Sequence, residues 1–274
     1  MDQHANDQTL DAIAAEAFDA LTQTKQVSPF SSRSHGLSVE DAYRVTSRVR
    51  QMFEARGAKN AGRKIGFTNR TIWDHYKVYA PIWGHAYDRT VHDLATTPEL
   101  SLRPFSEPLI EPEIMFGLAS APSAGMDEVA LSGCIDWVAL GYEIVQSIYP
   151  GWKFAAGDTI AAGGMHGGLM IGPRQPFAPR AVEWRRELTA FEIELSCNGQ
   201  VVDRGRAANV LDGPLSALRH LVELLAQDKV NPPLAAGEII STGTLTKAMP
   251  IAPGETWTTR PSGIALDGVT IGFV

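Results

Sequence analysis

Apolar positions in the first part of the chain recur at helical spacing. In residues 8–24, QTLDAIAAEAFDALTQT, one face of a helix would carry Leu10, Ile13, Ala14, Ala17 and Leu21. A second segment, residues 37–57 (LSVEDAYRVTSRVRQMFEARG), has Ser38 three residues before Asp41, which is typical of a helix start. The pattern predicts that the first 57 residues are mostly helical.

From residue 62 onward the pattern changes to short β-branched and apolar runs separated by Gly and Pro. The predicted strands are RKIGF, PEIMFGL, DWVALGYEIVQSIY, DTIAAGG, FEIELSCNGQVVDRG, EIISTG and GVTIGFV. Alternation on both sides of Asn198-Gly199 predicts a hairpin with a type I′ turn.

One long helix is predicted among these strands, in residues 211–227 (LDGPLSALRHLVELLAQ), with Asp212 as its N-cap and Pro214 in its first turn. A single long helix amid many strands favours a β-rich α+β fold, a mixed β-sandwich roll, over an alternating βαβ sheet. We expect two parts: an N-terminal helical cap or subdomain, residues 1–60, and a catalytic β-roll domain, residues 61–274.

Two glutamates interrupt an apolar run, PLIEPEIMFGL, in which Pro112 separates Glu111 from Glu113. In a strand, residues i and i+2 face the same way, so the two carboxylates would project from one face about 7 Å apart. Pro112 disfavours a helix and removes one ladder donor. Two like charges buried without partners would cost several kcal/mol each.

A divalent cation would remove this repulsion. Glu143, in the most apolar run of the chain, offers a third carboxylate. Carboxylates and water suit a hard ion such as Mg²⁺ or Mn²⁺, whereas zinc sites usually recruit His or Cys. The alternative is that Glu111 and Glu113 are ordinary surface residues on a polar strand face.

Composition narrows the class of partner. The 274 residues are 44% apolar and 20% charged, with a net charge of −7 and no Lys/Arg-rich run, which argues against a nucleic-acid partner. The partner is then expected to be a small molecule or another copy of the chain. Cys134 and Cys197 form no CxxC motif and are interpreted as reduced core thiols. No signal peptide or membrane-spanning run is found, so we expect a cytoplasmic protein without a membrane partner.

Five motifs together resemble a known family. GRKIGFT (62–68), Glu-Pro-Glu (111–113), GYEIVQS (141–147), DTIAAGGMHGGLMIG (158–172) and STGTLTKAMPIAPGETW (241–257) are similar in order and spacing to the 2-keto-4-pentenoate hydratase and 4-oxalocrotonate decarboxylase family of the fumarylacetoacetate hydrolase superfamily. The resemblance implies the mixed β-roll, homo-oligomers, a Mg²⁺ or Mn²⁺ ion, and 2-oxo or 2-hydroxydienoate substrates from aromatic-compound catabolism.

The resemblance also implies roles for individual residues. Glu111, Glu113 and Glu143 would be the metal ligands. Lys64 would approach the substrate as a catalytic residue, with a pKa lowered by partial burial. Asp88 in WGHAYDRT would act near the site. The substrate would be bound by Asp158, Thr159, Thr242, Gly243 and Thr244. A strand lysine and ordinary turn residues are the plainer alternatives.

The chain departs from the family at one place. Many of these hydratases carry an Asp-Asn pair where this chain has Ala162 and Gly163, followed by His166. This departure puts the usual pentadienoate substrate in doubt, because lost polar groups change what a site recognises. His166 could supply an acid or base in their place, or be structural.

The leading hypothesis is a metal-dependent hydratase that converts a 2-hydroxy-2,4-dienoate into a 4-hydroxy-2-oxo acid. A decarboxylase of the same family would use the same enolate chemistry, although the loop GTLTKAMPIAPGE favours the hydratase. A C–C bond hydrolase would need a His-x-x-Glu pair, and the candidate pair, His220 and Glu223, lies in a predicted helix. A non-catalytic relative that binds a metal or a small ligand is the remaining possibility.

Overall fold

The computed structural model describes residues 5–274, apart from the side chains of Ile72, His75 and Tyr76. Within this range the α-helices are α1 (Asp7–Gln23), α2 (Val39–Ala55), α3 (Trp73–Tyr76), α4 (Glu128–Ser132), α5 (Ala156–Ala161), α6 (Ala181–Ala190) and α7 (Pro214–Gln227). The strands are β1 (Asn60–Gly66), β2 (Ile82–Tyr87), β3 (Val91–Asp93), β4 (Glu99–Leu100), β5 (Leu109–Leu118), β6 (Ile135–Val145), β7 (His166–Ile171), β8 (Gln175–Pro176), β9 (Glu192–Cys197), β10 (Gln200–Arg206), β11 (Ile239–Thr244), β12 (Met249–Pro250), β13 (Thr256–Ser262) and β14 (Thr270–Phe273).

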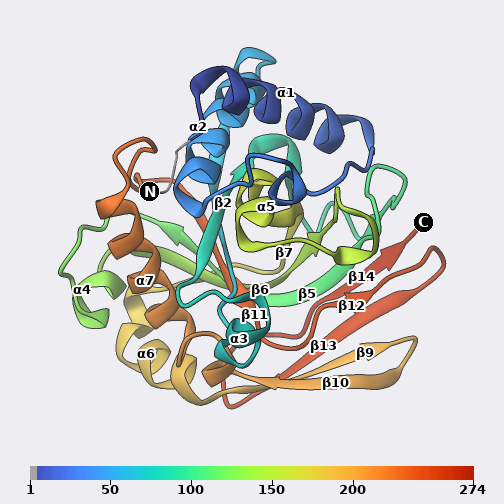
Figure 1. Cartoon of the computed structure of the whole chain (residues 1–274). Helices are drawn as coiled ribbons and strands as arrows, with labels where there is room; N and C mark the ends of the chain where they lie inside the picture. Colours follow the sequence, from blue (N-terminus) through green and yellow to red (C-terminus); the bar gives the residue numbers. More distant parts are fainter. Residues whose placement is uncertain (1–4) are drawn as a thin grey trace.

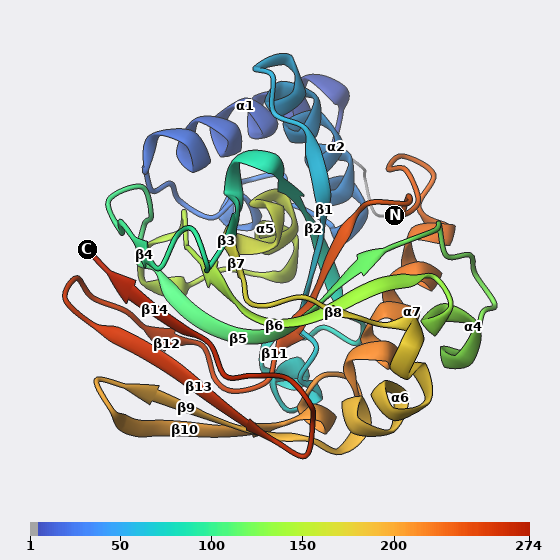
Figure 2. The same cartoon turned by 180° about the vertical axis from the view of Figure 1, so that it is seen from behind.

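The strands form two sheets. The larger has nine strands in the order β2-β1-β11-β5-β6-β7-β3, with β12 paired to β5 and β8 paired to β6. The smaller has the order β10-β9-β13-β14-β4. Parallel pairs, such as β1 with β11, occur beside antiparallel ones, such as β5 with β6. The predicted β-rich α+β class with N-terminal helices is confirmed (Figures 1 and 2).

The long central strand β5 divides its side chains between two environments. Ile110, Ile114 and Phe116 belong to the large apolar core, which also contains residues of α7 and of the smaller sheet. Because side chains alternate along a strand, Glu111 and Glu113 point to the opposite face. Alternation therefore directs both carboxylates away from the main core.

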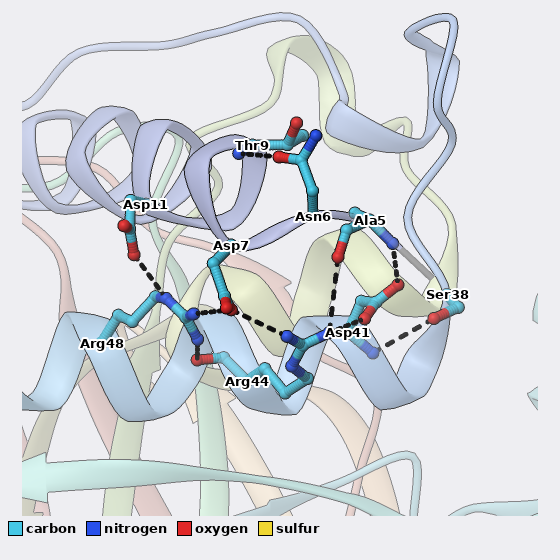
Figure 3. A network of polar contacts seen from close by, with 9 residues as sticks. All are labelled: Ala5, Asn6, Asp7, Thr9, Asp11, Ser38, Asp41, Arg44 and Arg48. Atoms are coloured by element: carbon cyan, nitrogen blue, oxygen red, sulfur yellow. Dashed lines mark hydrogen bonds and ion pairs between the residues drawn. The ribbon is translucent and has the colours of Figure 1, made fainter. Parts of the chain in front are cut away.

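Helices α1 and α2 pack on each other, and α2 also contacts α5; both views place them on the side of the larger sheet away from the β9–β10 hairpin (Figures 1 and 2). Figure 3 shows how charges join them: Asp7 accepts from Arg44 and Arg48, at 2.9 and 2.6 Å. The predicted start of α2 is confirmed, because the Ser38 hydroxyl accepts from the amide of Asp41. The division into a helical cap and a catalytic domain stays a prediction.

The hairpin at Asn198-Gly199 is also confirmed, with φ of 48° and 79°, as a type I′ turn requires. No helix in residues 5–274 has both the length and the apolar character needed to cross a membrane.

The segment DTIAAGG is not the predicted strand. It forms α5 and the start of the 3-10 turn η5 (Gly163–Met165), and β7 begins only at His166. The carboxylate of Asp158, in the first turn of α5, accepts a hydrogen bond from the amide of the N-cap residue Ala155 at 2.8 Å and so caps the helix. A short apolar run does not separate strand from helix by periodicity, and here the cap favours the helix.

The predicted N-cap of α7 is also wrong. The cap position is held by Gly213, whose φ of 146° is outside the usual range of L side chains, and Pro214 follows in the first turn as predicted. The carboxylate of Asp212 lies 2.7 Å from the Arg70 guanidinium instead. Helix α6 was not predicted from the sequence.

Candidate metal centre

Three carboxylates meet on the larger sheet at the β5–β6 pair. Glu111 lies directly opposite Glu143 in the antiparallel register, and Glu113 follows two residues along β5. One oxygen from each residue can be chosen so that all three lie within 4.8 Å of one another. Glu113 and Glu143 are fully buried, and Glu111 is half-buried. Such a group of oxygen ligands fits a hard divalent cation.

Strand β11 holds one oxygen of Glu113. The Ser241 hydroxyl donates to Glu113 Oε2 at 2.5 Å, and the amide of Gly243 donates to the same oxygen at 2.8 Å. The other oxygen, Oε1, is buried and has no hydrogen-bond donor among the described residues. A buried carboxylate oxygen without a donor is costly unless a cation binds it, so this atom fits a metal ligand.

Burial and mutual repulsion shift the titration of these carboxyls. Burial raises the pKa of Glu111 to about 7, against the opposing charge of Lys64 and with a further contribution from Glu143. Burial, then Glu143 and Glu111, raise the pKa of Glu113 well above its ordinary range. The protein alone therefore favours protons on these groups, and a bound cation would compete with the protons.

Lys64 projects from β1 into the same centre and is 4% exposed. Its Nζ lies 3.1 Å from Glu143 Oε2 and donates to the carbonyl of Gly164 at 2.8 Å. The predicted lowering of its pKa is wrong. Burial alone would lower the pKa, but Glu143 and the other two glutamates raise it above the ordinary lysine value. Lys64 is therefore a firmly held cation in this state.

His166 reaches the centre through Glu143. Its Nδ1 lies 2.8 Å from Glu143 Oε1, and its Nε2 lies 2.8 Å from the Thr90 hydroxyl. His166 does not line the cavity that contains Lys64 and Glu111, but a second cavity of about 600 Å³ that lies beneath α1 and α2. It therefore orients Glu143 rather than facing a ligand beside Lys64.

A cavity of about 360 Å³ opens beside the three carboxylates. Lys64 and Glu111 line it, as do two residues predicted to bind substrate, Thr159 and Thr244. The hydroxyl of Thr159 donates to the carbonyl of Ala156, and that of Thr244 donates to the carbonyl of Thr246. Their oxygen lone pairs remain able to accept a hydrogen bond from a ligand or water.

Two other predicted substrate-binding residues make contacts within the protein. Asp158 is fully buried, and its carboxylate accepts from the amide and hydroxyl of Ser31, at 2.9 and 2.5 Å. The Thr242 hydroxyl donates to the carbonyl of Ile114. Neither residue lines the cavity. Asp158 therefore ties the N-terminal segment to α5.

Asp88 is not brought to the centre either. It is exposed in the turn after β2, where its carboxylate accepts the amide of Lys59 at 3.0 Å. His220 and Glu223, the pair weighed for a hydrolase, lie on α7 and line neither cavity. The geometry therefore gives no support to a base at any of these three positions.

Sequence reasoning missed Ser241 and the carbonyl of Gly164, which hold Glu113 and Lys64. Ser241 could have been found, because strand alternation places it on the face opposite to Ile240. Gly164 could not, since its contact with Lys64 depends on the turn η5, in a segment predicted to be a strand.

Known proteins resemble this chain over most of its length. No family model matches it. The chain is 28% identical over 249 residues to a 2-hydroxyhexa-2,4-dienoate hydratase from Comamonas testosteroni, covering 90% of this chain and 92% of that protein. It is 29% identical over 261 residues to a 4-oxalocrotonate decarboxylase from Pseudomonas sp. strain CF600, covering 94% of each.

Solved structures of proteins from the same superfamily also resemble this chain. A 4-oxalocrotonate decarboxylase from Pseudomonas putida G7, complexed with magnesium and adipate, superposes with a TM-score of 0.89 at 26% identity over 98% of this chain and 99% of that one. A fumarylacetoacetate hydrolase family protein from Yersinia pestis CO92 shares the fold, with a TM-score of 0.55 at 14% identity over 78% of this chain and 92% of that one. The resemblance predicted from the five motifs is confirmed.

Proposed function

Because the chain is a relative of the 2-hydroxydienoate hydratases and 4-oxalocrotonate decarboxylases, we propose that it is a metal-dependent hydratase of a 2-hydroxy-2,4-dienoate. The ion would be Mg²⁺ or Mn²⁺, held by Glu111, Glu113 and Glu143. One observation carries the proposal: the buried Glu113 Oε1 has no hydrogen-bond donor in the part of the chain that the structure describes, and it belongs to a group of three carboxylates beside a cavity that Lys64 lines.

The reaction requires two proton movements and one addition. The C2 hydroxyl loses its proton and C5 gains one, which leaves a C3–C4 double bond conjugated to the C2 ketone. The oxygen of water then bonds to C4, and a proton goes to C3, giving the 4-hydroxy-2-oxo acid. When bound, the cation supplies positive charge that stabilises negative charge on the substrate's carboxylate and C2 oxygen.

Residues of the chain would transfer the protons and orient the attacking water. Lys64 lines the cavity, and its Nζ can hold a proton near the C2 oxygen or deliver it. The hydroxyls of Thr159 and Thr244, which already donate to carbonyls, can accept from the attacking water and so orient it. Asp88 and His166 do not line the cavity and take no direct part in the proposed proton transfers.

A direct test follows the conjugated absorbance of 2-hydroxypenta-2,4-dienoate with metal-stripped protein. We expect the absorbance to disappear when Mg²⁺ is added and a 4-hydroxy-2-oxo acid to accumulate. Glu113→Gln should abolish this change. Glu194→Gln, at a partly buried carboxylate that pairs with Arg204 on the smaller sheet, should not. Absence of any metal-dependent turnover with dienoates would favour the non-catalytic binding protein.

A decarboxylase is the second candidate, favoured by the TM-score of 0.89 to a 4-oxalocrotonate decarboxylase. The same cluster and Lys64 would stabilise the enolate that remains when CO₂ leaves. Release of CO₂ from 4-oxalocrotonate, faster than hydration of dienoates, would establish this activity in place of the hydratase. Cytoplasmic location and assembly as a homo-oligomer, both expected from the sequence, complete the proposal and rest on the sequence alone.

A further inference from the structure

The lining of the cavity beside the carboxylates is more apolar than polar. Its apolar lining includes Phe67, Ile82, Val145, Trp152, Phe154 and Met165. Among its lining residues the charged ones are Lys64, Glu111 and Lys247. Lys64 is held by Glu143 and the carbonyl of Gly164, and Lys247 is exposed. Within the described residues, no buried cation without a partner therefore lines the cavity.

Three of these large apolar residues have a left-handed backbone conformation. Phe67, Trp152 and Met165 have φ of 53°, 56° and 64°, in the left-handed region that bulky L residues rarely adopt. They come from three separate segments, yet all line this one cavity. Such conformations persist only where the surroundings impose them, and they cluster at ligand-binding sites.

Local contacts hold two of these conformations. The indole Nε1 of Trp152 donates to the carbonyl of Glu107 at 3.1 Å, and the carbonyl of Phe67 accepts from the indole of Trp73 at 2.7 Å. The Trp152 and Phe154 rings meet edge to face, 6.1 Å apart between centroids. We call the apolar lining residues Phe67, Ile82, Val145, Trp152, Phe154 and Met165 the apolar wall. These contacts hold the wall in place without a ligand.

We infer that this wall selects 2-hydroxydienoates whose far end is an uncharged apolar substituent, with Phe67, Trp152 and Met165 as specificity-determining residues. The inference rests on the proposed function, which places the substrate's carboxylate at the three glutamates. The far end of the substrate then lies against the apolar wall. Each methylene buried there tightens binding by about fourfold, whereas a second carboxylate would lose its water without gaining a buried cation.

The primary experiment measures binding of 2-oxo acids that cannot be hydrated. With saturating Mg²⁺, calorimetry compares 2-oxohexanoate with 2-oxoadipate, which differs by a terminal carboxylate. We expect 2-oxohexanoate to bind at least tenfold more tightly. Equal binding, or tighter binding of 2-oxoadipate, would overturn the inference. Failure of the proposed hydratase is distinguishable, because it appears as absent turnover while this binding preference persists.

Variants at the wall separate specificity from structure. Trp152→Gly and Met165→Gly remove the side chain without adding backbone strain, because Gly adopts the same φ. We expect the preference for 2-oxohexanoate to fall to within threefold of unity, with oxalate binding unchanged. Asn198→Gly, at φ 48° in the distant β9–β10 turn, is the matched control and should keep the preference. A preference retained in both wall variants would contradict their role.

Two lysine variants provide an independent check. Trp152→Lys should tighten 2-oxoadipate binding relative to 2-oxohexanoate, because it places a cation at the wall. Lys247→Ala should leave the ratio of the two dissociation constants unchanged. A ratio that moves more than tenfold further towards 2-oxohexanoate in Lys247→Ala would show that Lys247 pairs with a second carboxylate, and would refute the inference.

Discussion

The imidazole Nδ1 of His166 lies 2.8 Å from Oε1 of Glu143. On its other side Nε2 lies 2.8 Å from the Thr90 hydroxyl, so both ring nitrogens are engaged and the ring orientation is fixed. Lys64 approaches the second oxygen of Glu143 at 3.1 Å. Glu143 is thus held from two sides, and its position depends on residues from β1 and β7 as well as on β6.

His166→Ala should weaken Mg²⁺ binding by about 10–100-fold, because groups that orient a metal ligand contribute on that scale. Calorimetric titration of the metal-stripped protein measures the change. His166→Asn should restore part of the affinity through its side-chain amide, and His35→Ala, on the exposed loop before α2, is the control. Unchanged affinity and turnover in His166→Ala would remove His166 from the site.

Glu113→Gln should abolish the stabilisation of the protein by Mg²⁺. A ligand at 100 times its Kd adds about 2.7 kcal/mol to the free energy of unfolding, and about 2–4 °C of Tm accompanies each kcal/mol in a chain of this size. Thermal scans with and without Mg²⁺ measure this shift. Glu194→Gln should keep the full shift, and a full shift in Glu113→Gln would contradict its role as a ligand.

The pH dependence of the metal-free protein should report on Glu111, whose folded-state pKa is raised to about 7 from an ordinary 4.5. A carboxyl that binds its proton more tightly when folded stabilises the fold fully below pH 4.5 and loses this contribution as the pH rises through about 7. Glu111→Gln should therefore differ little from the wild type in Tm at pH 4.5 and become relatively more stable towards pH 8. An equal Tm difference between Glu111→Gln and the wild type at the two pH values would contradict the raised pKa of Glu111.

Lys64→Met should reduce turnover by about 10²–10⁴-fold, the usual contribution of a positioned acid or base. Mg²⁺ binding should be retained, because the three carboxylates remain and their repulsion increases without the lysine. Steady-state kinetics and calorimetry on one preparation separate the two effects. Lys25→Met, at an exposed position after α1, is the control, and loss of metal binding in Lys64→Met would point to a structural role instead.

Gly84→Ala should damage both stability and activity. A Cβ at Gly84 would lie 2.0 Å from the carbonyl oxygen of Gly163, which is backbone and cannot rotate away. The added methyl would push η5 off β2 and shift the Gly164 carbonyl that accepts from Lys64. We expect a loss of about 1–3 kcal/mol in urea unfolding and a marked fall in turnover.

Gly163→Ala is the matched comparison, since its Cβ would meet nothing within 4 Å and its φ of 65° is the only obstacle. We expect a smaller loss of stability, about 1 kcal/mol, and largely retained turnover. Equal losses of stability and turnover in the two variants would show that backbone strain at η5, and not the close approach of β2, limits substitution here.

The sequence was informative wherever a single strand determined the geometry. Alternation along β5 placed Glu111 and Glu113 on one face, and the apolar run around Glu143 identified the neighbouring strand. The two strands were also predicted, but nothing local predicts that Glu111 and Glu143 lie directly opposite each other. That relationship depends on sheet register, which is set by pairing over about thirty residues of intervening chain.

Tertiary contacts explain where the sequence was less informative. The substrate-binding role of Asp158 stays a prediction; in the structure its carboxylate accepts hydrogen bonds from the amide of Ala155 at the start of α5 and from the hydroxyl of Ser31 in the N-terminal segment. The pKa of Lys64 was expected to fall because of partial burial, whereas the charges that raise it lie on β5 and β6. The apolar wall could not be predicted from the sequence either, because Phe67, Trp152 and Met165 come from three separate segments of the chain.

The three carboxylates lie at positions 111, 113 and 143, and the groups that hold them come from positions as far apart as 64 and 241. No short stretch of chain can assemble this group before β1, β5, β6 and β11 have paired. A cation that needs all three oxygens can therefore bind only after the central sheet has formed. It would slow the unfolding rate and leave the folding rate unchanged, so that metal supply would govern the lifetime of the folded chain and not how quickly it folds.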